Sequence, residues 1–372
     1  MKLVAIIPRL NYSGAPKIMS WVINQMSLHG FDVSILVLYS SEVEQHLAPG
    51  IKTICLGIKQ SRSRLVRLFV QIWYVIRKIV DAIKKENPNF VLSFLDTTGF
   101  FISFFRKILF KNMVSQPKIM VSERCDPYTG YNNIVASFFK KRALEKSDMI
   151  VFQTTGAKDY FSKRIQSKSV VIPNPVISPK NSIAIPYSQR KNYIVSVGRL
   201  FNKQKRYDVL LKSFKLVQRE NDEVFLHIYG DGEDLEFIRK MIGKLKLKNV
   251  CCFGAVSNVI EKIQYAKAFV ISSDYEGIPN SLIEAMVAGV PCVSTNCRPG
   301  GAAFLIVDGV NGYIVPRGDY KAMSKKILKL LDDEEISNIF SKESPKIKNR
   351  YSESVISKMW IDAFAKIAGS NK

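Results

Sequence analysis

Two glutamates, Glu276 and Glu284, lie on either side of seven residues in the stretch SSDYEGIPNSLIEAM. The pattern around them predicts a buried strand over 268–274, a turn, and a helix over 281–289. A helix N-terminus presents unpaired N–H groups and the positive end of a dipole, which together can bind a diphosphate. A neighbouring carboxylate can accept hydrogen bonds from sugar hydroxyls, and its two oxygens suit a vicinal diol such as ribose. These residue types at this spacing are typical of a site for a phosphate and a sugar.

Each glutamate also has a simpler interpretation. Ser281 and Glu284 have the spacing of a capping box, in which both side chains bind the first N–H groups of a helix. Glu276 has no comparable local role, and an exposed loop carboxylate is the alternative for it. The motif alone leaves both interpretations open.

Cations precede this motif in the stretch SVGRLFNKQKRYDVLLKSF. Arg199 follows a predicted buried strand directly, and Lys203, Lys205 and Arg206 come just before the next predicted helix. We expect these cations at the same site as the glutamates, where they can neutralise a diphosphate. A solvated basic loop is the alternative for the lysines taken alone.

The elements that must position these residues alternate along the chain. Short β-rich runs followed by helical patterns predict parallel sheets with helices on both faces. The alternation stops within 170–192, where four prolines mark a linker, and then starts again. We expect an α/β fold with two Rossmann-like, doubly wound domains that face each other across a cleft. The predicted domains are 1–175, 176–350 and a final amphipathic helix, 351–372, that packs back toward the first domain.

Composition limits the class of protein. The 55 Lys and Arg residues against 32 Asp and Glu give a formal net charge of +23, which attracts the phosphates of nucleotides, lipids or nucleic acids. Six cysteines without a CxxC pair and three scattered histidines argue against a zinc site or a disulfide framework. The start MKLVAIIPRL suits a first strand better than a signal peptide, and charged residues interrupt the longest apolar stretch. We therefore expect a cytoplasmic protein with reduced thiols.

Several motifs together resemble the retaining glycosyltransferases of family 4, which have the GT-B architecture. The resemblance covers nearly the whole chain and rests on EGIPNSLIEAM, AGVPCVST, DGVNGYIV, VGRLFNKQKRYDVLL and VVIPNPV. It implies transfer of a sugar from a nucleoside-diphosphate sugar, a UDP-sugar above all, to a saccharide acceptor. Relatives of this kind build bacterial surface polysaccharides such as lipopolysaccharide and capsule.

The resemblance also assigns roles to residues. Arg199 and Lys205 would neutralise the donor diphosphate, Glu276 would contact the transferred sugar, and Glu284 would hold the ribose. Lys203 and Arg206 remain alternatives to Lys205. The implied donor site also includes Gly14, Gly277, Asn280 and Ser281.

The first domain departs from the family pattern at two places. Glu123 and Arg124 match a region near the transferred sugar, but Arg124 stands where relatives often have a histidine, and a guanidinium cannot act as a base. Gly14 belongs to a turn in which Ser13 replaces a second glycine. In the second domain, Phe304 stands where a glutamate is frequent.

The expected chemistry needs neither a metal nor a cofactor. Preorganised cations and helix N–H groups can stabilise the charge on a nucleoside diphosphate leaving group, and the sequence has no Asp-x-Asp motif. No carboxylate pair like that of retaining hydrolases is evident. We favour attack on the same face of the sugar through an oxocarbenium-like state.

Two segments of the first half, from Arg62 and from Phe100, mix aromatic, aliphatic and cationic residues. Basic amphipathic helices of this kind can lie on an anionic bilayer, although their apolar faces could instead cover the sheet. With the net charge, they favour a peripheral enzyme at the inner face of the membrane that acts on a lipid-linked saccharide.

Two other classes of function remain. A nucleic-acid-binding protein would use the same charge, but no recognition motif for nucleic acid is present, so we expect no such partner. A GT-B sugar-nucleotide epimerase would share the architecture and the diphosphate site. It would need no acceptor, so incubation with donor alone distinguishes the two enzymes.

Overall fold

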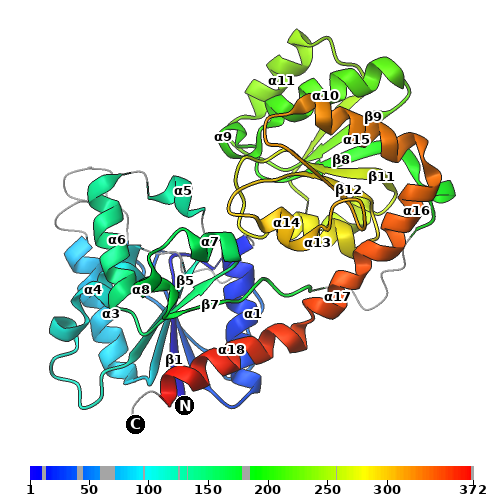
Figure 1. The fold of residues 1–372 in the computed structure, drawn as a ribbon. Helices are drawn as coiled ribbons and strands as arrows, with labels where there is room; N and C mark the ends of the chain where they lie inside the picture. Colours follow the sequence, from blue (N-terminus) through cyan, green and yellow to red (C-terminus); the bar gives the residue numbers. More distant parts are fainter. Residues whose placement is uncertain are drawn as a thin grey trace. The chain divides into compact units, whose positions relative to one another are not determined.

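The chain forms two compact units in a computed structural model that describes residues 1–10, 14–39, 45–58, 72–94, 97–124, 126–131, 133–177, 185–256 and 258–369 (Figure 1). Unit 1 comprises Met1–Pro173 and Ser354–Lys372, and unit 2 comprises Asn174–Glu353. The first division lies two residues before the predicted boundary after residue 175, and the second lies three residues after the predicted boundary at 350.

Unit 1 contains a seven-stranded parallel sheet in the order β3-β2-β1-β4-β5-β6-β7. Its strands are mostly continuous apolar runs because helices cover both faces; in β1, for example, all residues after Lys2 are buried. The strands are β1 (Lys2–Ile7), β2 (Asp32–Val37), β3 (Lys52–Cys55), β4 (Phe90–Phe94), β5 (Lys118–Glu123), β6 (Met149–Phe152) and β7 (Ser169–Val171).

The helices of unit 1 include one from the far end of the chain. The final helix, α18, packs Phe364 against Phe31 and Phe90, with ring centroids 5.5 and 5.2 Å apart, and packs Trp360 against Phe94 at 6.0 Å. The helices are α1 (Gly14–Leu28), α3 (Ile72–Glu86), α4 (Thr97–Leu109), α5 (Pro127–Gly130), α6 (Ile134–Lys146), α7 (Thr155–Asp159), α8 (Lys163–Gln166) and α18 (Glu353–Ala368).

Unit 2 contains a six-stranded parallel sheet in the order β10-β9-β8-β11-β12-β13. The order reverses between β8 and β11, as it does between β1 and β4 in unit 1, and ligands of open α/β sheets bind beyond the carboxyl ends of strands at such a point. The strands are β8 (Lys191–Val197), β9 (Phe225–Tyr229), β10 (Val250–Gly254), β11 (Ala266–Ile271), β12 (Cys292–Thr295) and β13 (Tyr313–Val315).

The helices of unit 2 enclose a core that includes Leu210, Phe214 and Ile327, all fully buried. They are α9 (Asn202–Lys205), α10 (Tyr207–Glu220), α11 (Leu235–Lys244), α12 (Val259–Ile263), α13 (Asn280–Val287), α14 (Gly301–Leu305), α15 (Tyr320–Asp332), α16 (Glu334–Glu343) and α17 (Ile347–Arg350). The predicted α/β fold with two parallel-sheet domains is confirmed.

Candidate functional site

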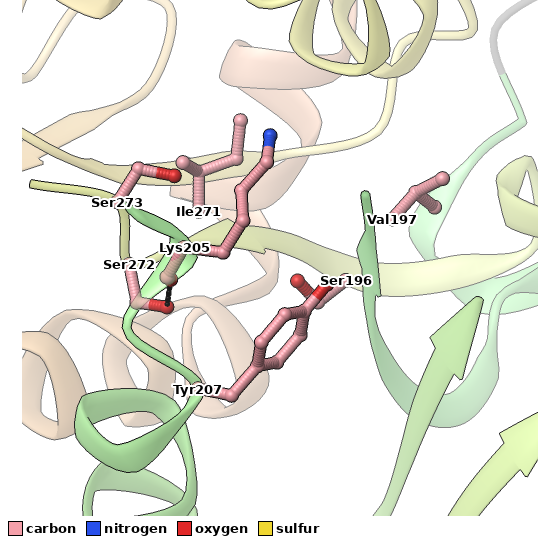
Figure 2. A pocket seen from close by; sticks show the side chains of 7 residues that line it. All are labelled: Ser196, Val197, Lys205, Tyr207, Ile271, Ser272 and Ser273. Carbon is pink, nitrogen blue, oxygen red and sulfur yellow. Dashed lines mark hydrogen bonds between the residues drawn. The ribbon is translucent and has the colours of Figure 1, made fainter. Parts of the chain in front are cut away.

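A pocket lies at the carboxyl ends of β8 and β11, the two strands between which the order of the second sheet reverses (Figure 2). It encloses about 190 Å³ that protein atoms do not fill, open solvent included. Figure 2 shows the Lys205 side chain extending past Ile271 and Ser273. The lining residues are Ser196, Val197, Lys205, Tyr207, Ile271, Ser272 and Ser273.

Lys205 and Glu276 form an ion pair at this pocket. Lys205 Nζ lies 2.6 Å from Glu276 Oε1, and the two side chains are only 16% and 10% exposed. The same carboxylate oxygen accepts a hydrogen bond from the Ser273 hydroxyl at 2.8 Å. Glu276 is therefore not an exposed loop carboxylate, which excludes the simpler interpretation of this residue.

Hydrogen bonds join the segment that carries Lys205 to the segment that carries Glu276. The hydroxyl of Ser272 donates to the carbonyl oxygen of Lys205 at 2.7 Å, and the N–H of Asp274 donates to the carbonyl oxygen of Gln204 at 2.9 Å. The Gln204 amide donates to the carbonyl oxygen of Tyr275 at 3.1 Å. These bonds fix the loop after β8 against the loop after β11.

The three neighbouring cations have different surroundings. The Arg206 guanidinium binds Asp208 and Asp274, and Lys203 is exposed on the outside of α9. Of the three, Lys205 is the one whose ammonium group meets Glu276. The geometry thus distinguishes Lys205 from Lys203 and Arg206, which the sequence alone could not do.

Arg199, the fourth cation, follows β8 and is exposed. Its guanidinium donates to Gln204 Oε1 at 3.3 Å and lies 5.1 Å from the centre of the Phe201 ring. Gln204 Nε2 in turn lies 3.5 Å from Glu276 Oε2, so one glutamine contacts both Arg199 and Glu276. The structure therefore brings Arg199, Lys205 and Glu276 together.

The start of α13 corrects the capping-box interpretation. Pro279, not Ser281, occupies the N-cap position, and no side chain caps the helix. The Ser281 hydroxyl donates instead to the carbonyl oxygen of Val197 at 3.1 Å, which ties α13 to the end of β8. The capping box was wrong because the helix begins at Asn280, one residue earlier than predicted, so Ser281 lies inside its first turn. Glu284, expected on the first turn, is the fifth helical residue.

Asn280 and Gly277 are each held by contacts that the sequence did not reveal. The buried Asn174 donates to Asn280 Oδ1 at 2.8 Å and to the carbonyl oxygen of Ile278 at 3.3 Å. The carbonyl oxygen of Gly277 lies against Gly301, where an added Cβ would be only 1.4 Å away. The turn between Glu276 and α13 is therefore fixed on two sides.

The remaining predicted residues lie in unit 1. Gly14 is the exposed first residue of α1, directly after residues 11–13, which lie outside the described residues.

Glu123 ends β5 and accepts a hydrogen bond from the Tyr131 hydroxyl at 2.7 Å. Arg124 donates to the Ser122 hydroxyl at 3.2 Å and lies 4.6 Å from the centre of the Phe94 ring. Burial lowers the pKa of Arg124 to about 9, so its guanidinium stays charged at pH 7.

Two contributors to the site were missed in the sequence. Gln204 contacts both charged partners, but a glutamine within a short basic segment gave no signal. Tyr207 is buried beneath the pocket and donates from its hydroxyl to the carbonyl oxygen of Gly198 at 3.1 Å. Burial, with a further contribution from the charge of Glu276, raises the pKa of the Tyr207 phenol. The tyrosine therefore remains a neutral donor.

Two kinds of feature are absent from the described part of the chain. There, no three His, Cys, Asp or Glu side chains gather as they would around a metal ion. Within the same residues, no helix is long and apolar enough to cross a bilayer.

The family model matches a segment of the second unit. Residues 179–347 match the family model described as glycosyl transferases group 1. A poly(glycerol-phosphate) alpha-glucosyltransferase of Bacillus subtilis (strain 168) is 31% identical over 52% of this chain and 28% of its own length. The amylovoran biosynthesis glycosyltransferase AmsD of Erwinia amylovora is 23% identical over 97% of this chain and 99% of its own length. The chain spans less than two thirds of the length of the B. subtilis relative, at 28%, and of two uncharacterized glycosyltransferases from Haemophilus influenzae and Methanocaldococcus jannaschii, at 65% and 59%.

Solved structures resemble the whole chain. The apo form of the lipopolysaccharide outer core galactosyltransferase WaaB superposes with a TM-score of 0.77 at 21% identity, over 98% of this chain and 99% of that chain. HepE of Anabaena, solved in complex with UDP, gives a TM-score of 0.76 at 13% identity over 98% and 100% of the two chains. At these identities the likeness concerns the fold alone. The chain therefore has the two-domain fold of the GT-B glycosyltransferases, and its residues 179–347 match the group 1 glycosyl transferases.

Proposed function

We propose that this protein transfers a sugar from a nucleoside-diphosphate sugar, with UDP as the nucleotide, to a saccharide acceptor in the biosynthesis of a surface polysaccharide. The observation that carries the proposal is the Lys205–Glu276 pair, 2.6 Å apart at the point where the strand order of the second sheet reverses. A cation and a carboxylate held side by side offer one group to a phosphate and the other to sugar hydroxyls.

Lys205 and Arg199 would bind and stabilise the diphosphate leaving group. When the donor binds, the Lys205 ammonium would turn from Glu276 to the diphosphate, and the exposed Arg199 would approach it from the solvent side. Both cations would then stabilise the negative charge that develops as the sugar–oxygen bond breaks. Removing one preorganised donor from such a site typically costs about 10²–10³ in turnover.

The first turn of α13 would complete the donor site. Its N–H groups and dipole favour a phosphate, and Gly277 lets the donor approach the backbone at this point. Glu276 would then accept from hydroxyls of the transferred sugar, and Glu284 from the ribose. Asn280 and Ser281 would hold the helix start in place, through Asn174 and Val197.

The other proposed residues lie in unit 1: Gly14 for the donor, and Glu123 and Arg124 for the sugar or the acceptor. Gly14 lies where α1 begins, and Glu123 and Arg124 lie at the carboxyl end of β5. Arg124 would act as a fixed positive charge and not as a base, because a guanidinium does not give up its proton near pH 7.

The proposal extends to the stereochemical course and to metal independence. Two preorganised cations can neutralise a diphosphate without a divalent ion. We propose attack on the same face of the sugar, with retention of anomeric configuration. Activity should therefore persist in EDTA, and loss of activity that magnesium or manganese restores would contradict this part of the proposal.

The nucleotide and the type of product are proposed from the relatives. HepE is described in complex with UDP, and the relatives from B. subtilis and E. amylovora are named for a glycerol-phosphate polymer and for amylovoran. These names favour UDP and a polysaccharide of the cell surface for this chain.

A lipid-linked acceptor is favoured by one end of helix α6. Ile134, Val135 and Phe138 expose 86%, 66% and 56% of their surface, although they are apolar. They belong to the first turns of α6, which follows β5 and α5, so they lie toward the edge of the sheet at which β5 ends (Figure 1). Apolar side chains there could enter the acyl boundary of a membrane that carries the acceptor.

Cations follow these apolar residues along the same helix. Lys140, Lys141 and Arg142 lie in the next turns, where they could contact anionic lipid phosphates. Of the amphipathic segment predicted from Arg62, residues 62–71 lie outside the described residues. We propose that α6 contacts the inner face of the membrane and that the protein binds there peripherally.

Titration with UDP tests the donor site. Lys205→Ala should weaken UDP binding by roughly tenfold, as expected for the loss of about 1.4 kcal/mol from one charge contact. Lys203→Ala, two residues away on the exposed side of α9, is the matched control and should bind UDP like the parent. Equal affinities in all three proteins would contradict the proposed site.

Incubation of UDP-sugars without acceptor should give no isomerised sugar, since an isomer would indicate an epimerase.

A further inference from the structure

We infer that Arg206 is a positioning residue that holds Lys205 against Glu276 and does not itself bind the donor. The inference rests on the proposed function, since it explains how that site keeps its geometry. Arg206 lies between α9 and α10 with a left-handed backbone, φ 52° and ψ 48°. This conformation is unfavourable for a residue with a Cβ, so its side chain must contribute something that glycine would not.

The guanidinium joins two carboxylates from different elements. Its Nε and Nη2 lie 2.9 and 3.0 Å from the two carboxylate oxygens of Asp208, in a bidentate contact at the start of α10. Its Nη1 lies 2.8 Å from Asp274 Oδ2, in the loop after β11. Arg206 therefore spans the gap between the segment that carries Lys205 and the segment that carries Glu276.

The Arg206–Asp274 contact lies next to the Lys205–Glu276 pair in the chain. Lys205 is adjacent to Arg206 in the chain, and Glu276 is two residues after Asp274. The Arg206–Asp274 contact and the Lys205–Glu276 contact thus connect the same two loops, as does the bond from the Ser272 hydroxyl to the Lys205 carbonyl oxygen. Loss of the Arg206–Asp274 contact should let Lys205 and Glu276 separate.

Charge argues against a direct role for Arg206 in donor binding. Two carboxylates already neutralise its guanidinium, so a phosphate would have to displace one of them. Hydrogen bonds to Asp208 raise the pKa of Arg206, as expected for a cation held by anions. Lys205, in contrast, faces a pocket.

Arg206→Gly tests the inference because glycine keeps the left-handed backbone and removes only the clamp. The readout is the rate at which an amine-reactive acetylating reagent labels Lys205, measured by mass spectrometry of the peptide. We expect severalfold faster labelling of Lys205 in Arg206→Gly, with exposed Lys203 unchanged as the internal control. Asp274→Asn, a second variant that keeps Arg206, should show the same change. Unchanged labelling of Lys205 in both variants would overturn the inference, whatever the function of the pocket.

A double-mutant cycle with UDP separates positioning from direct binding. If Arg206 acts through Lys205, Arg206→Gly weakens UDP binding in the parent but changes it less than twofold in a Lys205→Ala background. Equal losses in both backgrounds would mean that Arg206 binds the donor itself, which contradicts the inference. If Lys205→Ala alone leaves UDP affinity unchanged, the proposed donor site fails, while the labelling experiment still decides the role of Arg206.

Discussion

Gly301 and Gly277 approach so closely that a Cβ atom added to Gly301 would lie 1.4 Å from the carbonyl oxygen of Gly277. Gly301 begins α14, and Gly277 directly follows Glu276. Two backbones from different loops thus touch without an intervening side chain. The position of the Glu276 loop therefore depends on Gly301, a residue that has no role of its own in the proposed donor site.

Gly301→Ala should lower the rate of sugar transfer by roughly 10²-fold, because a shift of about 1 Å in a positioning loop can have that effect. Gly243→Ala is the matched control: a Cβ there would meet nothing within 4 Å, and Gly243 lies within helix α11. The control should keep parental turnover and gain roughly 0.5–1 kcal/mol in the free energy of unfolding. Turnover with a defined donor and a thermal melt check both variants, and a fully active Gly301→Ala would show that the loop tolerates the displacement.

Ser281→Ala and Glu284→Gln should affect different properties. Ser281→Ala removes the hydrogen bond to Val197 and should cost about 1 kcal/mol in the free energy of unfolding. Glu284→Gln keeps the size of the side chain and removes the charge proposed to hold the ribose, so it should weaken UDP binding more than it lowers the melting temperature. Calorimetric titration beside a thermal melt measures both. A Glu284→Gln variant with parental UDP affinity and a lowered melting temperature would show that Glu284 stabilises α13 and does not bind the donor.

Replacement of both Ile134 and Phe138 by serine should weaken binding to anionic vesicles, because these exposed side chains precede the cations of α6. Val307→Ser in unit 2 is the control, since Val307 is likewise 55% exposed. The parent should co-sediment with vesicles that contain phosphatidylglycerol and be released by salt, which screens charges over about 10 Å at 0.1 M. Equal binding of the parent to neutral vesicles, or parental binding by the double variant, would argue against this surface.

Glu86 should make stability depend on pH. Its buried carboxylate accepts a hydrogen bond from Ser34 and lies 2.5 Å from Lys52 Nζ and 2.9 Å from Lys2 Nζ, and the contacts with Lys52 and Lys2 lower its pKa to about 2. A carboxyl group whose pKa is depressed on folding stabilises the protein above its unfolded pKa, and the stabilisation is lost as pH falls through the folded pKa.

Glu86→Gln should therefore lower the melting temperature at pH 7, and the difference from the parent should shrink as pH falls from about 4.5 toward 2. Thermal melts of both proteins at pH 7, 5 and 4 measure the onset of this change. A difference that grows on acidification would show that the ion pairs do not set the pKa of Glu86.

The fold and the main cations of the site could be predicted because both depend on local patterns. Continuous apolar strands between helical segments indicate parallel sheets, and Arg199, Lys205 and Glu276 each follow a strand that ends at the same edge. The choice between Lys205 and Arg206 could not be made from the sequence. It depends on Asp274, which is 68 residues from Arg206 along the chain and meets it only after the sheet has formed.

The start of α13 could not be predicted correctly from the sequence for the same reason. Ser281 and Glu284 have capping-box spacing, but the hydroxyl bonds to Val197, which lies 84 residues away. A tertiary contact thus replaced a local one. The exposed aromatic residue Phe138 was missed for a different reason: most of the large apolar residues of α6 lie in its first half and the charged residues in its second half, which gives no helical periodicity.

The packing of α18 on unit 1 affects the order in which the protein can fold during synthesis. Phe31, Phe90 and Phe94 contact Phe364 and Trp360, which the ribosome adds only after all of unit 2. Unit 1 is translated first but must wait for residues 354–368 to cover these aromatic rings, whereas unit 2 is continuous and can fold as soon as it emerges. The aromatic rings of unit 1 that α18 covers therefore stay without that cover until the whole of unit 2 has been translated.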